Sequence, residues 1–234
     1  MSRIYLVLTA TVCFHVGCET TTKTSAEYQF PEAKPTSIRE SQLKDLEDEV
    51  ARYPKRHELH YQIAGVRFQL EDYRGAELAL LRALDIRPND SKYHYQLGRI
   101  HLRSGELEAA ETHFRKATLL VSENRYTGPH AALGYVLAKR ERYVEAIEEF
   151  KKCVAIEPDN PSFYYFLGSV YDILGDRDAT IDHFQGYLTR GGVTYRDKVR
   201  FILEKLGVEV VEMPYAGTNT LLDEAVIPGF DEGI

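Results

Sequence analysis

The sequence is poor in cysteine, which excludes one common way of stabilising a small exported protein. Only Cys13, Cys18 and Cys153 occur among 234 residues, too few for a framework of disulfides. Cys153 stands alone in the second half of the chain, and a buried single cysteine usually packs as a small hydrophobic residue. We therefore predict no redox or nucleophilic role for Cys153.

An excess of basic residues is also missing. The chain has 29 Lys and Arg against 36 Asp and Glu, which gives a formal net charge of −7. Binding to nucleic acid needs a basic surface that neutralises phosphates. The composition therefore argues against a nucleic-acid partner.

Motifs that carry chemistry are absent as well: there is no glycine-rich phosphate loop, no serine or cysteine nucleophile motif and no recognisable carboxylate pair. The histidines are the remaining candidates. His57 and His60 are three residues apart, and His60, His94 and His130 recur at similar intervals. Two imidazoles without a third ligand make a weak metal site, and packing between helices is the favoured interpretation. We predict no enzyme activity, no metal and no cofactor.

The N-terminal segment lacks the length of a membrane-spanning helix. Its apolar run extends from Ile4 to Val16, shorter than the roughly 20 residues that a span requires. Together with Arg3 it is typical of a secretory signal. The ending Gly17-Cys18 resembles the lipobox of bacterial lipoproteins, although His15 stands where an aliphatic residue is preferred.

This resemblance implies a signal peptide over residues 1–17 and a lipid on Cys18. The mature protein would then be held at a membrane of the bacterial cell envelope, on its periplasmic face. Cleavage without lipidation and a short uncleaved anchor are the alternatives. Residues 18–35, rich in threonine and polar groups, cannot bury enough apolar surface to fold alone and are predicted to be a flexible tether.

A helix is predicted next, within residues 36–56. Ser37 is expected to cap its start, with Glu40 reaching back as the second half of a capping box. Leu43, Leu46 and Val50 then fall on one face. Such a helix would cover the apolar side of the element that follows it.

A repeat dominates the chain from this point on. Small residues recur at Ala76, Ala110, Ala146 and Thr180, with spacings of 34, 36 and 34 residues. The longer spacing is explained by an insertion at 125–126. A period of this length is the mark of a repeat architecture.

The accompanying residues resemble the tetratricopeptide repeat, which has Leu-Gly or similar at positions seven and eight, Ala at twenty and twenty-seven, an aromatic residue at twenty-four and Pro at thirty-two. Positions seven and eight of the four repeats are Ile63-Ala64, Leu97-Gly98, Leu133-Gly134 and Leu167-Gly168. The later positions hold Ala76, Leu80, Ala83 and Pro88 in the first repeat, Ala110, Phe114 and Ala117 in the second, Ala146, Phe150, Cys153 and Pro158 in the third, and Phe184 in the fourth. Ser122 departs from the pattern, as do Thr180, Tyr187 and Gly192 in the last repeat.

The resemblance implies an all-α fold, a right-handed superhelical solenoid of about four helix–turn–helix repeats over residues 57–90, 91–124, 127–160 and 161–194. The helix of residues 36–56 would close its N-terminal end. A solvating helix within 195–207, ending at Gly207, would close the other.

In this family the first helix of each pair lines a binding groove. Transferring its inward positions predicts a partner-binding groove of Tyr61, Phe68, Lys92, Tyr95, Arg99, Arg103, Tyr135, Lys139 and Tyr165. Aromatic and basic side chains suit an extended partner segment with carboxylates and apolar groups. The alternative is that the tyrosines pack between helices and the charges are solvated. The carboxylate clamp of the chaperone-binding branch is not present.

The tail, residues 208–234, holds six acidic residues and no Lys or Arg: Glu209, Glu212, Asp223, Glu224, Asp231 and Glu232. These alternate with apolar residues, as in segments that bind rather than fold alone. The tail is predicted to occupy the chain's own groove or to engage a partner; a merely solubilising tail is the alternative.

As a whole the sequence predicts a lipid-anchored scaffold for protein–protein interaction in an envelope assembly. The alternative function is an accessory or recruiting subunit of a cell-wall, polysaccharide or pilus-secretin system.

Overall fold

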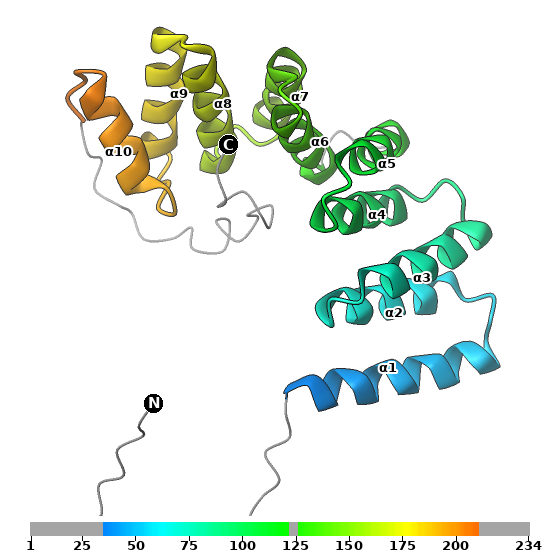
Figure 1. Cartoon of the computed structure of the whole chain (residues 1–234). Coiled ribbons are helices and arrows are strands. Elements are labelled where there is room, and N and C mark those ends of the chain that lie inside the picture. The colour runs from blue at the N-terminus through cyan, green and yellow to red at the C-terminus, as the bar shows by residue number, and fades with distance from the viewer. Residues whose placement is uncertain (1–34, 122–125, 211–234) are drawn as a thin grey trace, which may run out of the picture. The chain divides into compact units, whose positions relative to one another are not determined.

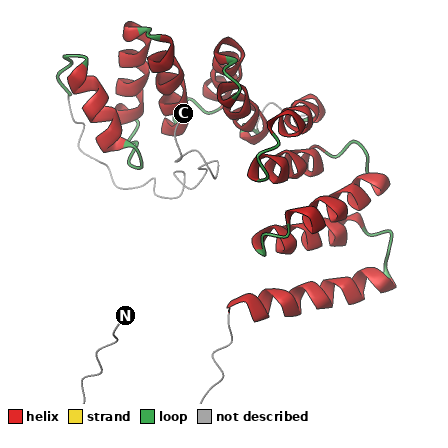
Figure 2. Cartoon of the chain, viewed as in Figure 1, coloured by secondary structure: helices red, strands yellow, loops and turns green. Residues whose placement is uncertain are grey.

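The computed structural model describes residues 35–121 and 126–210, and within them the chain forms ten helices and no strand (Figures 1 and 2). The helices are α1 (Pro35–Arg52), α2 (His57–Gln69), α3 (Tyr73–Ile86), α4 (Ser91–Arg103), α5 (Leu107–Leu120), α6 (Gly128–Lys139), α7 (Tyr143–Ile156), α8 (Pro161–Leu174), α9 (Arg177–Thr189) and α10 (Arg196–Lys205). The predicted all-α fold class is confirmed. The signal segment, Cys18, the tether up to residue 34 and the tail from residue 211 lie outside the described residues.

The helices pack in consecutive pairs. The closest partners are α2 with α3, α4 with α5, α6 with α7 and α8 with α9, and each pair packs on the next through its second helix. α1 packs on α2 at one end and α10 on α9 at the other. The described chain is therefore a solenoid of four helix pairs with one additional helix at each end.

A glycine on the first helix and an aromatic ring on the second hold three of the pairs together. A Cβ atom added at Gly98 would lie 2.5 Å from the Phe114 ring, and one at Gly168 would lie 2.5 Å from the Phe184 ring. Gly134 faces Phe150 in the same way at 2.8 Å. The missing side chain lets each ring lie directly against the partner backbone, which explains the spacing of these residues in the sequence.

The turn inside each pair requires one residue with positive φ. Gly105 and Gly175 adopt φ values of 79° and 72°, whereas Glu71 and Glu141 adopt 61° and 60° at the equivalent places. Glycine occupies this region freely, but a residue with a Cβ does so at a cost of about 1 kcal/mol. The sharp reversal is thus kept in all four pairs, with or without glycine.

The two outer helices cover the ends of the core. Leu43, Leu46 and Val50 of α1 pack on the cluster around Ile63 and Ala64. However, α1 begins at Pro35, so Ser37 lies inside its first turn and the predicted N-cap at Ser37 is wrong. The fixed φ of proline suits the first helical position, which accounts for the earlier start.

At the other end, Val199 and Leu203 of α10 are fully buried against the core. Gly207 follows with a φ of 70°.

In the third repeat Cys153 is also buried, and its thiol donates to the Thr127 carbonyl oxygen at 3.7 Å. Burial raises the pKa of the Cys153 thiol, which keeps it protonated and unreactive.

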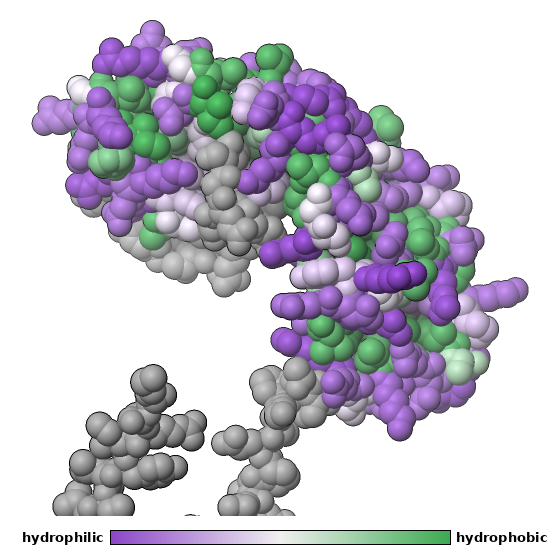
Figure 3. Space-filling model, in the orientation of Figure 1, coloured by the Kyte–Doolittle hydropathy of each residue, from purple (hydrophilic) through white to green (hydrophobic). Residues whose placement is uncertain are grey.

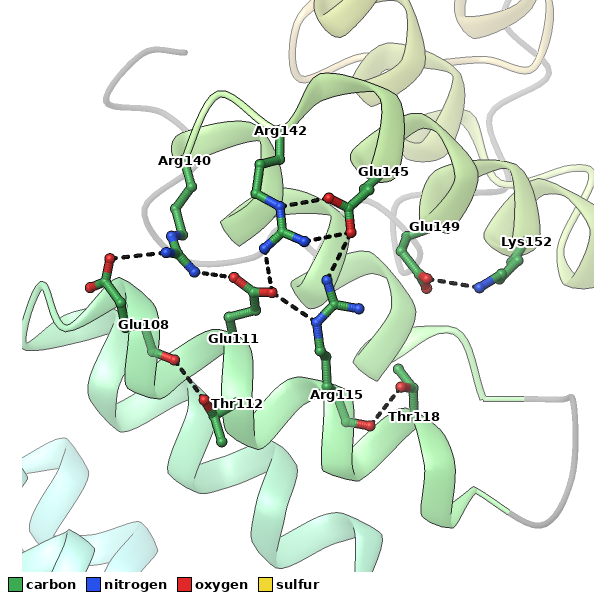
Figure 4. A network of polar contacts seen from close by, with 10 residues as sticks. All are labelled: Glu108, Glu111, Thr112, Arg115, Thr118, Arg140, Arg142, Glu145, Glu149 and Lys152. Carbon is green, nitrogen blue, oxygen red and sulfur yellow. Dashed lines mark hydrogen bonds and ion pairs between the residues drawn. The ribbon is translucent and has the colours of Figure 1, made fainter.

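A cluster of ion pairs joins α5 to α6 and α7 (Figure 4). Glu111, whose side chain is 8% exposed, accepts hydrogen bonds from Arg115 Nε at 2.8 Å and Arg142 Nη1 at 2.7 Å, and also pairs with Arg140. Glu145 accepts from both Arg115 and Arg142, at 3.0 and 2.6 Å. Each carboxylate is shared between Arg115 of α5 and at least one arginine of the turn between α6 and α7, so the cluster fixes how one repeat sits on the next.

On the face drawn in Figure 3, the coloured residues are mostly hydrophilic, with separate hydrophobic patches between polar side chains. In the part of the chain that the structure describes, no helix combines the length and apolar character needed to cross a membrane.

Candidate binding site on the first helices of the repeats

A cavity of about 340 Å³ lies between α2 and α4, the first helices of the first two pairs. Its lining residues are Tyr61, Gln62, Ala64, Gly65, Phe68, Gln69, Leu80, Gln96, Arg99 and Ile100. Gly65 helps to keep it open, because a Cβ atom added there would meet no atom within 4 Å. The cavity combines an apolar floor with side-chain amides, a phenol and a guanidinium group, as ligand sites commonly do.

Arg99 is held in place by its neighbours. Its Cζ atom lies 5.4 Å from the centroid of the Phe68 ring and 5.9 Å from that of the Tyr95 ring. Its Nη1 donates to Gln96 Oε1 at 3.0 Å, and Gln96 Nε2 donates to the Tyr61 hydroxyl at 3.3 Å. These contacts orient the guanidinium group without neutralising it.

No carboxylate of the described residues lies within ion-pair distance of Arg99, in contrast to the arginines of the Glu111 cluster. A guanidinium group that is oriented by rings and an amide, and faces a cavity, is suited to a carboxylate supplied from outside.

The structure brings together some of the predicted groove residues. Tyr61, Phe68 and Arg99 line the cavity, and Tyr95 flanks it through its contact with Arg99. Lys92 and Arg103, both exposed, do not line it.

The remaining predicted residues lie further along the solenoid. Tyr135 is 3% exposed, with Lys139 Nζ 5.7 Å from its ring centroid. Tyr165 is 2% exposed and stacks on Tyr195 with centroids 3.9 Å apart. Tyr165 also lines a separate, smaller cavity of about 100 Å³. For Tyr165, packing between helices describes the observed contacts better than an open groove wall does.

Sequence reasoning missed Gln62 and Gln96 of the cavity, and also Tyr126. Tyr126 meets Tyr95 edge-on, with ring centroids 5.9 Å apart. Burial raises the pKa of Tyr126 to about 12 and also raises that of Tyr95, so both phenols keep their protons at neutral pH. Tyr126 belongs to the insertion that interrupts the period, so no repeat position could have identified it. Gln62 and Gln96 each lie one residue after a predicted tyrosine.

The recurring histidines have structural partners. His60 Nε2 lies 3.1 Å from the Pro54 carbonyl oxygen, and His94 Nε2 lies 3.3 Å from that of Pro88. Tyr164 makes the same contact with the Pro158 carbonyl oxygen at 3.0 Å. A ring at this position therefore satisfies the carbonyl group six residues earlier, where the preceding helix has ended. Across residues 35–121 and 126–210 no group of three or more His, Cys, Asp or Glu is suited to hold a metal ion.

Comparison with known proteins supports the tetratricopeptide-repeat family. Residues 61–123 match the family described as tetratricopeptide repeat, and residues 134–175 match the one described as TPR repeat. The TPR repeat-containing protein MJ1428 of Methanocaldococcus jannaschii is 28% identical over 129 residues, which are 55% of this chain and 22% of that protein. The chain spans about a fifth of the length of the curated relatives that it matches.

Solved structures show the same fold. PilW, a type IV pilus biogenesis factor, is 19% identical with a TM-score of 0.62, covering 72% of this chain and 80% of PilW. YrrB, described as a TPR protein with an unusual peptide-binding site, is 18% identical with a TM-score of 0.60, covering 72% of this chain and 84% of YrrB. At these identities the likeness establishes the solenoid of repeats.

Proposed function

We propose that this chain is a scaffold that binds an extended acidic and apolar segment of another protein in the cavity between α2 and α4. The observation that carries the proposal is Arg99, oriented over Phe68 and facing a cavity of about 340 Å³ without a carboxylate partner among the described residues. A partner carboxylate would pair with Arg99, while a neighbouring apolar side chain would contact Phe68 and Ile100. The tetratricopeptide-repeat matches agree with a role in protein binding.

The chain's own tail is one segment of this chemistry. Residues 211–234 contain five of its six acidic residues and no basic residue. We therefore propose that the tail competes with the partner for the same cavity. Charge complementarity supports this arrangement, because the acidic groups of the tail match Arg99 and the exposed Arg103.

A change of charge at Arg99 tests the cavity. The probe is a synthetic peptide of residues 211–234, titrated into a chain that ends at Val210, since Val208 and Val210 pack on the core. Arg99→Glu should weaken binding by about 10- to 100-fold, because a charge-assisted pair worth roughly 1.5–3 kcal/mol becomes a repulsion. Fluorescence anisotropy gives the dissociation constants, and added salt should weaken the wild-type interaction.

Arg82→Glu is the matched control, since Arg82 is an exposed arginine of α3 outside this cavity. It should leave affinity within about twofold, because solvent and salt screen an exposed charge outside the site. Equal weakening by both variants would show general charge attraction and refute the cavity as the site. Absence of wild-type binding at millimolar peptide would remove the tail as an occupant.

We further propose that the chain acts at the bacterial cell envelope, held by a lipid on Cys18. The support is the sequence of residues 1–18, with its basic start, apolar run and Gly17-Cys18 ending. The fold of a pilus biogenesis factor, PilW, is similar. An accessory or recruiting subunit of a cell-wall, polysaccharide or pilus-secretin system is the more specific candidate of this kind.

Cys18→Ser tests the anchor. We expect the variant to lose lipid labelling and to move from the membrane fraction to the soluble fraction of cells, because the acyl chains supply the membrane affinity. Metabolic labelling with a fatty-acid analogue and fractionation measure both effects, with Cys153→Ser as the control that keeps its label. A Cys18→Ser protein that stays membrane-bound after a high-salt wash would contradict the lipid anchor.

A further inference from the structure

Three histidines form a column between α4 and α5. His113 of α5 lies between His94 and His101 of α4, with ring centroids 5.5 Å from the first and 5.3 Å from the second. The ring planes are nearly parallel, at 26° and 13°. His94 and His101 are 8% and 7% exposed, so two of the three rings are withdrawn from water. The cavity site described above uses none of these rings.

The hydrogen bond between His94 and His113 requires a neutral His94 ring. A carbonyl oxygen only accepts, so His94 Nε2 must donate to Pro88, and in a neutral ring His94 Nδ1 is then an acceptor. His113 Nδ1, 3.2 Å away, must donate to it. His101 Nδ1 donates to the Glu106 carboxylate at 2.7 Å. One proton therefore joins His94 to His113, and a second proton there would set two donors face to face.

We propose that this imidazole column is an acid-sensitive joint, at which protonation of His94 or His113 loosens the packing of α4 on α5. A proton added to His94 occupies Nδ1 and removes the acceptor between the two rings, whereas a proton added to His113 goes to Nε2. Either proton places positive charge within a stack that also contains His101. The inference concerns the fold itself and holds whether or not the cavity binds a partner segment.

The carboxylates around the column lie beside His101 and near His94. Glu106 contacts His101 directly, and Glu77 of α3 lies 3.9 Å from His101 Nε2. Asp90, before α4, favours charge on His94, whereas Lys116 of α5 opposes charge on both His94 and His113. Positive charge on His113 is thus opposed by Lys116 and by the neighbouring histidines.

The titration follows this geometry. Burial lowers the pKa of His113 to about 4, with further lowering by the charges of His101, His94 and Lys116. Burial also lowers the pKa of His94, against the opposite effect of the Pro88 carbonyl. Since an unfolded histidine titrates near 6.5, the unfolded chain binds these protons more tightly. The stabilisation is therefore complete above about pH 6.5 and is lost as the pH falls from there towards 4.

The joint also adjoins the proposed binding cavity. Helix α4 contains His94 and His101 of the column, and it also contains Gln96 and Arg99 of the cavity. If the proposed function holds, acid would lower the affinity of the cavity by loosening one of its walls. This consequence rests on the proposed function, whereas the loosening itself does not.

Hydrogen exchange on the full chain tests the joint without any ligand. After correction for the intrinsic pH dependence of exchange, opening of α4 and α5 should be about thirtyfold more frequent at pH 5.0 than at pH 7.5, the ratio that a shift of the His113 pKa from 6.5 to about 4 implies. His113→Phe keeps a flat ring in the stack but cannot titrate, and its change should be clearly smaller, since only His94 then contributes.

His183→Phe is the matched control. His183 is a half-buried histidine of α9 that stacks on Tyr171 at 5.3 Å, and burial lowers its pKa too. Its replacement should leave the pH response of α4 and α5 unchanged.

An equal response in wild-type and His113→Phe chains would overturn the proposal. If His113→Phe fails to fold, NMR titration of wild-type His113 decides, because a pKa near 6.5 would contradict the joint. A failed Arg99 binding test would leave both readouts unaffected.

Discussion

Ala110→Arg should lower the free energy of unfolding by at least about 4 kcal/mol, the range reached when a charge is forced into a core. Ala110 of α5 is 0% exposed and belongs to the same buried cluster as Phe114 and Ala131. A guanidinium group cannot be solvated among the apolar side chains of this cluster. Because helix pairs share their packed faces, the loss should spread from α4 and α5 to α6 and α7.

Urea unfolding followed by circular dichroism measures this loss. Ala155→Arg on α7 makes the same chemical change at an exposed position, so it should shift stability by less than about 0.5 kcal/mol. If the two variants unfolded at the same urea concentration, Ala110 could not be part of the interface between helices. A smaller unfolding slope for Ala110→Arg would show that part of the chain had already opened.

Glu111→Gln should have the second largest effect, about 2 kcal/mol. The substitution keeps the shape but leaves Arg115, Arg140 and Arg142 around a neutral amide (Figure 4). Removing one member of a buried ion cluster costs roughly 3–5 kcal/mol. The three guanidinium groups are 28–41% exposed here, so solvent screening reduces the expected value.

Glu108→Gln is the comparison for this cluster. Glu108 pairs with Arg140 at 3.1 Å, but its side chain is 79% exposed, so its loss should cost less than about 0.5 kcal/mol.

The pH dependence of stability gives a second readout for Glu111. Burial alone would raise the Glu111 pKa, but hydrogen bonds from Arg115 and Arg142 lower it below the usual value of 4.5.

The stabilisation by Glu111 is therefore present above about pH 4.5 and is lost as the pH falls through the lower folded value. In the Glu111→Gln variant this acid-dependent loss should be smaller than in the wild type. An equal loss of stability in Glu108→Gln and Glu111→Gln would mean that burial does not distinguish the two carboxylates.

The fold could be predicted because its determining contacts lie within one helix pair. Gly98 contacts Phe114 within one helix pair, and Gly168 contacts Phe184 within another. Each contact therefore leaves its own mark at a fixed spacing. The start of α1 at Pro35 was missed because a helix before the first repeat has no period to place it, and capping patterns define a start only to within a few residues.

The candidate site could be predicted in part for the same reason. Tyr61 and Arg99 come together because the inward positions of successive first helices share a face. Whether a ring on that face is exposed depends on other elements. Tyr165 is covered by Tyr195, which precedes α10 and is not part of the repeat pattern. The histidine column was missed because stacking depends on rotamers that spacing does not define. His183 holds the position of His113 in the fourth repeat, but there it stacks on Tyr171 and not on a histidine.

The packing of each helix pair on its immediate neighbours also determines how the chain reaches its fold. Little loop-closure entropy opposes contacts between residues that are near in sequence, so chains rich in local contacts fold in microseconds to milliseconds. A pair that has emerged from the ribosome can dock on the preceding pair before the rest of the chain is made. The glutamates with positive φ, Glu71 and Glu141, make two of the hairpin closures slower to nucleate than those at Gly105 and Gly175. Growth of the native structure can thus begin at the glycine turns and spread outwards along the solenoid.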